Sequence, residues 1–193
     1  MALVDLATCL LKDLSKRLLT DCSNECPDES NKEIIEDSLW DTPPKSSWID
    51  KDGTPNNVWE AVTRKVWNYA STLLPRDFDG FEYWASQINK GNCLPIHKDK
   101  DEALHTKTGQ LEHPFIGSVY YCHKELPTGG FLQIERGRSR ELERIQPVPN
   151  RLVLFDSSNY HSVSEIRHGV RRHLATNIWL KKPDEDNFKS ERY

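Results

Sequence analysis

The sequence predicts a mainly β protein, a barrel or jelly roll, with helices in its N-terminal part. From Phe78 onward, short runs rich in β-branched and aromatic residues alternate with Gly, Pro and Asn turns, which is the pattern of short strands. These runs are not separated by the crossover helices that a parallel sheet requires. The predicted strands lie at 81–88, 115–122, 130–135, 144–147, 151–155 and 170–180.

Two amphipathic helices are expected before the strands. Over 3–19, leucines recur roughly every three to four residues, which makes one helical face apolar. A second helix starts near Asn57 and must end by Leu74, because Pro75 follows it. Turn-forming residues punctuate 31–57 between the two helices. The side chains expected to anchor that stretch to the core are Leu39, Trp40, Trp48 and Ile49.

One domain is expected for a chain of 193 residues, because two halves would each have a thin core. We expect a helical and loop part at 1–77 that packs on the core, a β core at 78–182, and a charged tail at 183–193 that frays. The apolar N-terminus is interrupted by charged residues, so neither a signal peptide nor a membrane span is expected.

The charge and the cysteines indicate which partners and compartment to expect. A net charge of −4 argues against a general nucleic-acid binder, whose surface is basic. Five cysteines cannot all pair within one chain, and free thiols in a reducing compartment are the simplest account of them. They are Cys9, Cys22, Cys26, Cys93 and Cys122. We therefore expect a cytoplasmic protein, or a nuclear one, with neither a membrane nor a nucleic acid as partner.

Two histidines and one aspartate form the candidate metal site. His97 and Asp99 follow a predicted strand and turn, and residues i and i+2 of an extended segment point to the same side. His161, which follows the apolar strand at 151–155, is the best candidate for a third ligand from elsewhere in the chain. Two histidines and a carboxylate on one face leave open positions suited to Fe(II) and oxygen activation. A structural zinc site would be closed and would usually recruit thiolates.

An arginine ten residues beyond His161 strengthens this hypothesis. Arg171 lies on the last predicted strand. A dicarboxylate that chelates iron at one end needs a fixed partner for its other carboxylate, and arginine supplies a planar two-pronged donor. The alternative is an ordinary surface arginine paired with a nearby glutamate.

Taken in order, these motifs resemble the 2-oxoglutarate/Fe(II)-dependent dioxygenases, and within them the prolyl-4-hydroxylase-like branch. The resemblance covers about half of the chain, from roughly residue 81 to 180. The motifs that carry it are Leu94-Pro-Ile-His-Lys-Asp99, Gly117-Ser-Val-Tyr-Tyr121, Thr128-Gly-Gly-Phe-Leu-Gln-Ile134, Asn150-Arg-Leu-Val-Leu-Phe155, and His161-Ser-Val-Ser-Glu-Ile166 followed by Gly169-Val-Arg171 and Trp179.

The resemblance implies a double-stranded β-helix, a cupin-like jelly roll, with its metal site inside one mouth. His97, Asp99 and His161 fall at the positions of the catalytic iron ligands, and Arg171 falls where relatives bind the distal carboxylate of 2-oxoglutarate. The implied cofactors are Fe(II) and 2-oxoglutarate, and ascorbate is compatible with them. Related halogenases replace the carboxylate ligand with a small residue, so Asp99 favours hydroxylation over halogenation.

Further residues are candidates for the co-substrate pocket. His173 stands where relatives often carry Ser or a similar small polar residue near the carboxylate, which is a departure from the family pattern. Tyr120 or Tyr121 is expected to offer a hydroxyl to the co-substrate, with Tyr120 favoured.

The substrate pocket is expected to have walls from the strand at 81–88. The candidates are Tyr83, Trp84 and Gln87. Period-2 alternation puts Tyr83 and Gln87 on one face and Trp84 on the other, and either face can look inward. For Trp84, a place in the core is an equal alternative. The acidic pair Asp101-Glu102 either attracts a cationic substrate group or forms a solvated loop.

The predicted function is hydroxylation of a small molecule or amino acid, with O2 consumed and with succinate and CO2 as co-products. The first alternative is hydroxylation of a protein side chain, of the prolyl type. A second is a non-catalytic jelly-roll binding module, and a third is a cupin-like metal enzyme that does not use 2-oxoglutarate and does not need Arg171. The sequence contains no signal for an oligomeric state.

Overall fold

The computed structural model describes residues 37–75, 77–122, 126–136 and 141–188. The helix expected at 3–19 lies outside these residues, as do the first three cysteines of the chain. None of the described helices is long and apolar enough to cross a membrane. The described part comprises nearly all of the predicted β core together with the second predicted helix.

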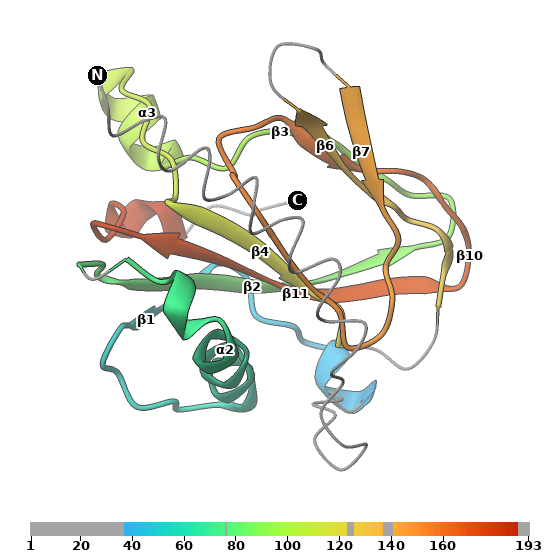
Figure 1. The fold of residues 1–193 in the computed structure, drawn as a ribbon, viewed down its shortest axis with the longest axis horizontal. Coiled ribbons are helices and arrows are strands. Elements are labelled where there is room, and N and C mark those ends of the chain that lie inside the picture. The colour runs from blue at the N-terminus through green and yellow to red at the C-terminus, as the bar shows by residue number, and fades with distance from the viewer. Residues whose placement is uncertain (1–36, 76, 123–125, 137–140, 189–193) are drawn as a thin grey trace.

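Two antiparallel sheets face each other across a shared interior (Figure 1). The larger sheet contains, in spatial order, β1 (Ser47–Asp50), β2 (Gly80–Asn89), β11 (Val170–Trp179), β4 (Ile116–Tyr120) and β8 (Leu152–Phe155). The smaller contains β3 (Leu94–His97), β9 (His161–Val163), β6 (Leu132–Arg136) and β7 (Glu141–Ile145), and a short pair joins β10 (Ile166–His168) to β5 (Thr128–Gly129). Because the chain passes repeatedly between the sheets, the arrangement is a double-stranded β-helix, and the predicted fold class is confirmed.

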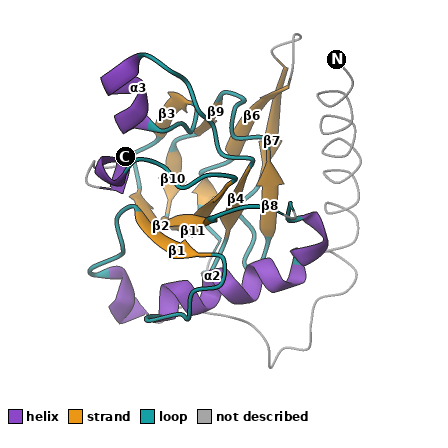
Figure 2. Ribbon diagram, turned by 90° about the vertical axis from the view of Figure 1, so that its left-hand side faces the viewer, coloured by secondary structure: helices purple, strands orange, loops and turns teal. Residues whose placement is uncertain are grey.

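Helix α2 (Val58–Tyr69) covers the outer face of the larger sheet (Figure 2). The Asn57 side chain caps its first turn by accepting a hydrogen bond of 2.9 Å from the Glu60 N–H. A single 3-10 turn, η3 (Ser71–Leu73), follows, and the helical stretch stops before Pro75 as predicted. The apolar side of α2 that packs on the sheet consists of Trp59, Val62, Val66 and Trp67.

Buried aromatic and aliphatic side chains of the stretch before α2 pack into the core between α2 and the larger sheet. Trp40, at the end of η2 (Asp37–Trp40), packs edge-on against Trp59 of α2, with ring centroids 4.9 Å apart. Ile49 of β1 is also buried, and both residues act as the predicted anchors. Trp48 is only half-buried.

Both faces of the larger sheet are buried, which is why its central strands lack a clean polar face. On β2, Phe81, Tyr83 and Ala85 pack toward α2, whereas Trp84 and Ser86 line the space between the sheets. The apolar core between the sheets consists of Val119, Tyr121, Leu132, Ile134, Ile145, Val153 and Phe155.

The strand predicted at 144–147 begins and ends earlier, as β7. Glu141, Leu142 and Arg144 are exposed on this strand, which lies at the edge of the smaller sheet. An edge strand buries few side chains, so its hydrophobic pattern is too weak to define its limits from the sequence.

A short helix, α3 (Glu102–Thr108), follows the predicted metal-binding aspartate and was not expected. Asp101 caps it by accepting a hydrogen bond of 2.9 Å from the Leu104 N–H, and it ends at Gly109, which has a φ of 75°. None of its residues is buried, so no apolar period marks it in the sequence. The acidic pair Asp101-Glu102 is therefore a helix start and not a solvated loop.

The expectation that the C-terminal tail frays is wrong for 183–188. This stretch contains the 3-10 helix η5 (Glu185–Phe188), and its Asn187 is fully buried. Composition misleads here, because the charged residues of the stretch face outward while one amide is inserted into the interior.

Candidate metal centre

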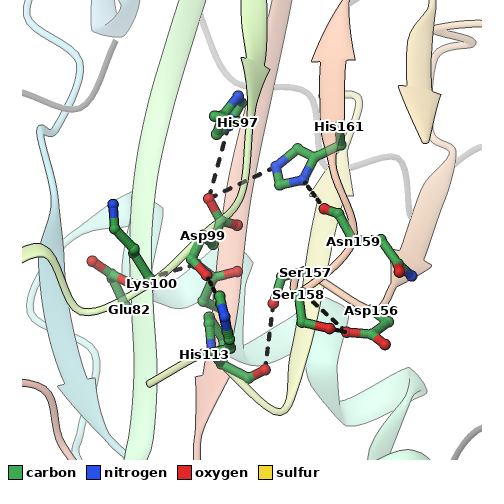
Figure 3. A network of polar contacts seen from close by, with 12 residues as sticks. Glu82, His97, Asp99, Lys100, His113, Asp156, Ser157, Ser158, Asn159 and His161 are labelled. Carbon is green, nitrogen blue, oxygen red and sulfur yellow. Dashed lines mark hydrogen bonds and ion pairs between the residues drawn. The ribbon is translucent and has the colours of Figure 1, made fainter. Parts of the chain in front are cut away.

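The three predicted metal ligands converge at one point in the interior. His97 ends β3 and His161 begins β9, and these two residues are direct partners in the antiparallel ladder. Asp99 lies two residues beyond β3 and turns back toward them (Figure 3). Its Oδ1 is 3.9 Å from Nε2 of His97 and 3.7 Å from Nε2 of His161. All three potential ligand atoms lie within 4.8 Å of one another.

The backbone orients both imidazole rings. Nδ1 of His97 lies 2.8 Å from the carbonyl oxygen of Pro95, and Nδ1 of His161 lies 3.0 Å from that of Asn159. A carbonyl can only accept, so each Nδ1 carries a proton, and in the neutral form of each ring the lone pair is then on Nε2. The two lone pairs point into the space in front of Asp99, as is usual for histidines that bind a metal.

Asp99 is positioned through its backbone. Its N–H donates to the carbonyl oxygen of Ser157 at 3.2 Å, and its own carbonyl accepts from Nδ1 of His113 at 2.5 Å. The carboxylate is almost entirely buried, with 5% of the residue exposed. His113 thus supports the backbone of Asp99.

Arg171 lies on the same inner surface, fully buried. Its Nε donates to the Gly130 carbonyl at 3.0 Å, its Nη2 donates to the Tyr121 hydroxyl at 3.1 Å, and its Nη1 lies 2.6 Å from Nδ1 of His173. A guanidinium only donates, so Nδ1 of His173 is the acceptor and its proton sits on Nε2. No carboxylate among the described residues forms an ion pair with Arg171.

One cavity of about 40 Å³ connects the histidine–aspartate cluster with Arg171. His173 and Trp84 also line it, so both of these predicted site residues face the interior. The rest of its wall is formed by Ser86, Leu94, Ser118, Val119, Leu132, Phe155, Val163 and Ala175. The site thus combines a metal-binding end, a cationic end and a mostly apolar lining.

The preference for Tyr120 over Tyr121 is wrong. The Tyr120 side chain belongs to the core under α2, and its hydroxyl donates to Oδ1 of Asn150 at 2.7 Å. Tyr121 points the opposite way, into the interior, where its hydroxyl meets Arg171. Adjacent residues of a strand point to opposite faces, and Val119 shares the face of Tyr121.

Tyr83 and Gln87 do not line the cavity, contrary to their selection as substrate contacts. The Tyr83 hydroxyl donates to Oε1 of Glu60 at 2.8 Å on the α2 side, and burial is the main cause that raises its pKa to about 12. Gln87 is exposed and accepts a hydrogen bond of 2.8 Å from Nε of Arg172. Ser86, which was not among the predicted contacts, lines the cavity because it shares the face of Trp84.

Comparison with known proteins gives a family for this geometry. The model of the 2OG-Fe(II) oxygenase superfamily matches residues 83–181. A PKHD-type hydroxylase of Klebsiella pneumoniae (strain 342) is 24% identical over 119 residues, which cover 62% of this chain and 50% of the relative. The chain therefore spans about half the length of this curated relative.

Two solved structures share the fold. A prolyl-4-hydroxylase of Pseudomonas putida superposes with a TM-score of 0.50 and 17% identity, covering 72% of this chain and 73% of the other. A prolyl hydroxylase of Trichoplax adhaerens, in complex with a hypoxia inducible factor oxygen degradation domain peptide fragment, superposes with a TM-score of 0.51 and 16% identity, covering 92% and 81%.

The matched region contains the whole cavity described above. All three converging ligands, the buried arginine and both of the long central strands fall within 83–181, apart from the first residues of β2. The match covers more than half of the chain. The chain therefore belongs to the 2OG-Fe(II) oxygenase superfamily.

Proposed function

We propose that the protein is a non-haem Fe(II) oxygenase that uses 2-oxoglutarate and O2 to hydroxylate an aliphatic carbon, releasing succinate and CO2. One observation carries this proposal. A cluster of two imidazoles and one carboxylate shares a small cavity with a fully buried guanidinium, and no described carboxylate pairs with that guanidinium.

The donor set fits iron. Two neutral imidazoles and a carboxylate on one face are typical of Fe(II) sites that keep open positions, whereas closed structural zinc sites favour thiolates. Neither of the described cysteines, Cys93 and Cys122, is part of the cluster. Because Nδ1 of His97 and of His161 faces a backbone carbonyl, Nε2 is the atom that each ring can offer to a metal.

The cationic end fits the distal carboxylate of 2-oxoglutarate. A buried charge is unfavourable unless an opposite charge compensates it. A carboxylate facing Arg171 would supply that charge and would find the Tyr121 hydroxyl beside it. His173 lies beside the guanidinium in the same wall.

Different residues of the chain are expected to bind the metal, orient the co-substrate and exclude water. When bound, Fe(II) and 2-oxoglutarate supply the oxidising chemistry by consuming O2 and decarboxylating the 2-oxo acid. His97, Asp99 and His161 would hold the metal, and Arg171 with Tyr121 would orient the co-substrate. The lining chains of Leu132, Val163 and Phe155 keep the cavity apolar, which limits access of bulk water.

A small molecule or amino acid is the substrate that we favour. The net charge of −4, which argues against a nucleic-acid substrate, supports it. The second candidate is a protein side chain, which the names of the similar hydroxylases support. Incubation with free amino acids and with proline-containing peptides, followed by mass spectrometry for a gain of one oxygen, distinguishes the two substrates.

Anaerobic titration with Fe(II) and 2-oxoglutarate tests the central proposal. We expect a weak visible charge-transfer band that is absent in His161→Ala and retained in His168→Ala, a matched histidine that is exposed on β10. A band that survives His161→Ala contradicts the assigned ligand set.

The same titration separates the alternatives of a binding module and of a metal enzyme without 2-oxoglutarate. Metal binding that does not respond to 2-oxoglutarate, or to Arg171→Lys, would favour a metal enzyme that does not use 2-oxoglutarate. Succinate that stays at background with every substrate would favour the binding module.

A further inference from the structure

The C-terminal segment Asp184–Phe188 lies against α3. In the sequence, α3 directly follows the loop that carries Asp99. Figure 1 shows the red C-terminal helix directly beside α3, and Figure 2 shows the same neighbours from the side. The two segments are more than seventy residues apart in the sequence. Their contacts join the end of the chain to the metal-binding region.

Asn187 is the centre of this contact. Its side chain is fully buried, and its Oδ1 accepts a hydrogen bond of 3.0 Å from the N–H of Glu102. Its Nδ2 donates to Oε1 of Glu82 at 3.2 Å. One amide therefore connects the start of α3 to the inner surface of the larger sheet.

The Glu82 carboxylate is a rigid support for Asn187. It is fully buried on β2, and it also accepts from Oγ of Ser46 at 2.8 Å and from Nε1 of Trp179 at 2.9 Å. These donors come from both sides of the strand, from the segment before β1 and from the end of β11. A carboxylate held by several donors has little freedom to move, so its position is fixed relative to the sheet.

Two further contacts tie the segment to the same loop. The Asp184 N–H donates to Oδ2 of Asp101 at 2.9 Å, while Oδ1 of Asp101 caps α3 at Leu104. Nζ of Lys107 pairs with the carboxylates of Asp184 and Asp186, each at 2.8 Å. The loop from Asp99 to α3 is thus anchored by the last described residues of the chain.

Asp99 is the ligand whose position depends on a loop, in addition to its own backbone bonds to Ser157 and His113. His97 and His161 lie on paired strands, whose ladder fixes their positions. Asp99 lies outside a strand, and only two residues separate it from Glu102, whose N–H donates to Asn187. The placement of its carboxylate opposite the two Nε2 atoms depends on where this loop is held.

We propose that Asn187 is a positioning residue for the metal ligand Asp99, acting through Glu102 and supported by Glu82. This inference rests on the proposed role of the histidine–aspartate cluster as a metal site. It gives the C-terminal segment a function in metal binding, which the sequence does not suggest.

Fe(II) affinity, measured on the full chain by anaerobic equilibrium dialysis, tests this inference. We expect Asn187→Ala to weaken Fe(II) binding by about tenfold, in the range found for residues that support metal ligands. Asn57→Ala is the matched control, because it removes the cap of α2 on the outer face of the larger sheet without touching Glu82 or the loop. It should lower the unfolding midpoint and leave Fe(II) affinity unchanged.

A reciprocal exchange provides a rescue test. Asn187→Asp keeps an acceptor for Glu102 but places a carboxylate beside that of Glu82, so it should weaken Fe(II) binding at least as much. Adding Glu82→Gln restores a donor–acceptor pair between the two positions with their roles reversed, and Fe(II) affinity should recover. Lys107→Met removes the ion pairs that hold the same segment and should cause a smaller loss of Fe(II) affinity. This variant provides the test if Asn187→Ala fails to fold.

Equal loss of Fe(II) affinity in Asn187→Ala and Asn57→Ala would overturn the inference, because the effect would then follow stability alone. Wild-type affinity in Asn187→Ala or in Lys107→Met would overturn it too, while the proposed function stands. If the wild-type protein binds no Fe(II), both the proposed function and the inference fail. Loss in Asn187→Asp without recovery in the double variant would also count against it.

Discussion

At the scale of single residues, adjacent residues have unrelated roles because successive side chains along a strand point to opposite faces. Tyr120 is part of the core under α2, and Tyr121 contacts the buried arginine. The same alternation separates Tyr83, which contacts α2, from Trp84, which lines the cavity. Residue type therefore says less about function here than position along the strand.

The tyrosine pair gives a test of this difference. Tyr121→Phe removes the hydroxyl beside Arg171 and should weaken 2-oxoglutarate binding about fivefold, since one hydrogen bond contributes about 1 kcal/mol. Isothermal titration of the Fe(II)-loaded protein under anaerobic conditions measures this change. Tyr120→Phe, the matched control, loses its bond to Asn150 and should lower stability without changing 2-oxoglutarate affinity. Equal effects of both variants on 2-oxoglutarate binding would contradict the assignment.

The two described cysteines should differ in reactivity. Cys93 is exposed, whereas Cys122 is buried, and burial raises the pKa of its thiol to about 12. A raised pKa leaves almost no thiolate near neutral pH, and the thiolate is the reactive form. Alkylation of the native protein followed by peptide mass spectrometry should therefore label Cys93 and leave Cys122 unmodified until the protein is denatured. Rapid labelling of Cys122 in the native state would disagree with its placement under α2.

At the scale of elements, the turn between β5 and β6 shapes the arginine site. Gly130 has a φ of 65°, and a Cβ added there would lie 2.5 Å from Cδ1 of Ile166 and 3.1 Å from Cδ of Arg171. Its carbonyl also accepts the Arg171 Nε–H. The backbone therefore leaves no room for a Cβ beside Ile166 and the aliphatic part of Arg171, and its positive φ also favours glycine.

A pair of glycine substitutions isolates this steric requirement. Gly130→Ala should lower the free energy of unfolding by about 2–4 kcal/mol, through strain at positive φ together with the clash. Gly109→Ala has a similar φ of 75° but meets no atom within 4 Å, so it should lose only about 1 kcal/mol. Urea denaturation of both variants measures the difference. Equal losses would show that the close approach to Arg171 is unimportant.

At the scale of the whole molecule, the two sheets bring together groups that no single element could assemble. The smaller sheet supplies the paired histidines and the larger one supplies Arg171, with Leu132 and Phe155 packed between the sheets. The spacing of the sheets therefore sets the separation of the metal-binding and cationic ends of the cavity. On the other side of the larger sheet, α2 is attached through a buried polar contact as well as through apolar packing.

That contact predicts a pH dependence of the whole fold. The Tyr83 hydroxyl donates to Glu60, and burial is the main cause that raises its pKa from 10.0 to about 12. A raised folded-state pKa means that the stability contribution is complete below pH 10 and is lost as the pH rises toward 12. Tyr83→Phe should therefore show a shallower decline of the free energy of unfolding over this window, followed by chemical denaturation at each pH. An unchanged slope would mean that Tyr83 does not titrate with folding.

The sequence determined the strands with strong hydrophobic patterns and the identity of the residues that converge. The i, i+2 spacing of His97 and Asp99 is a local property, and the stop at Pro75 follows from the backbone of one residue. The edge strand β7 and the capped helix α3 bury few side chains, so the sequence contains little signal for them.

Only the tertiary structure decided which face of each strand looks into the cavity. Alternation establishes that Tyr83 and Gln87 share a face, but whether that face meets α2 or the metal depends on packing between distant segments. The burial of Asn187 is decided in the same way, because its partners Glu82 and Glu102 lie far from it in the sequence. A periodic pattern in the sequence indicates which side chains share a face. The free energy of packing the whole chain determines which other residues that face contacts.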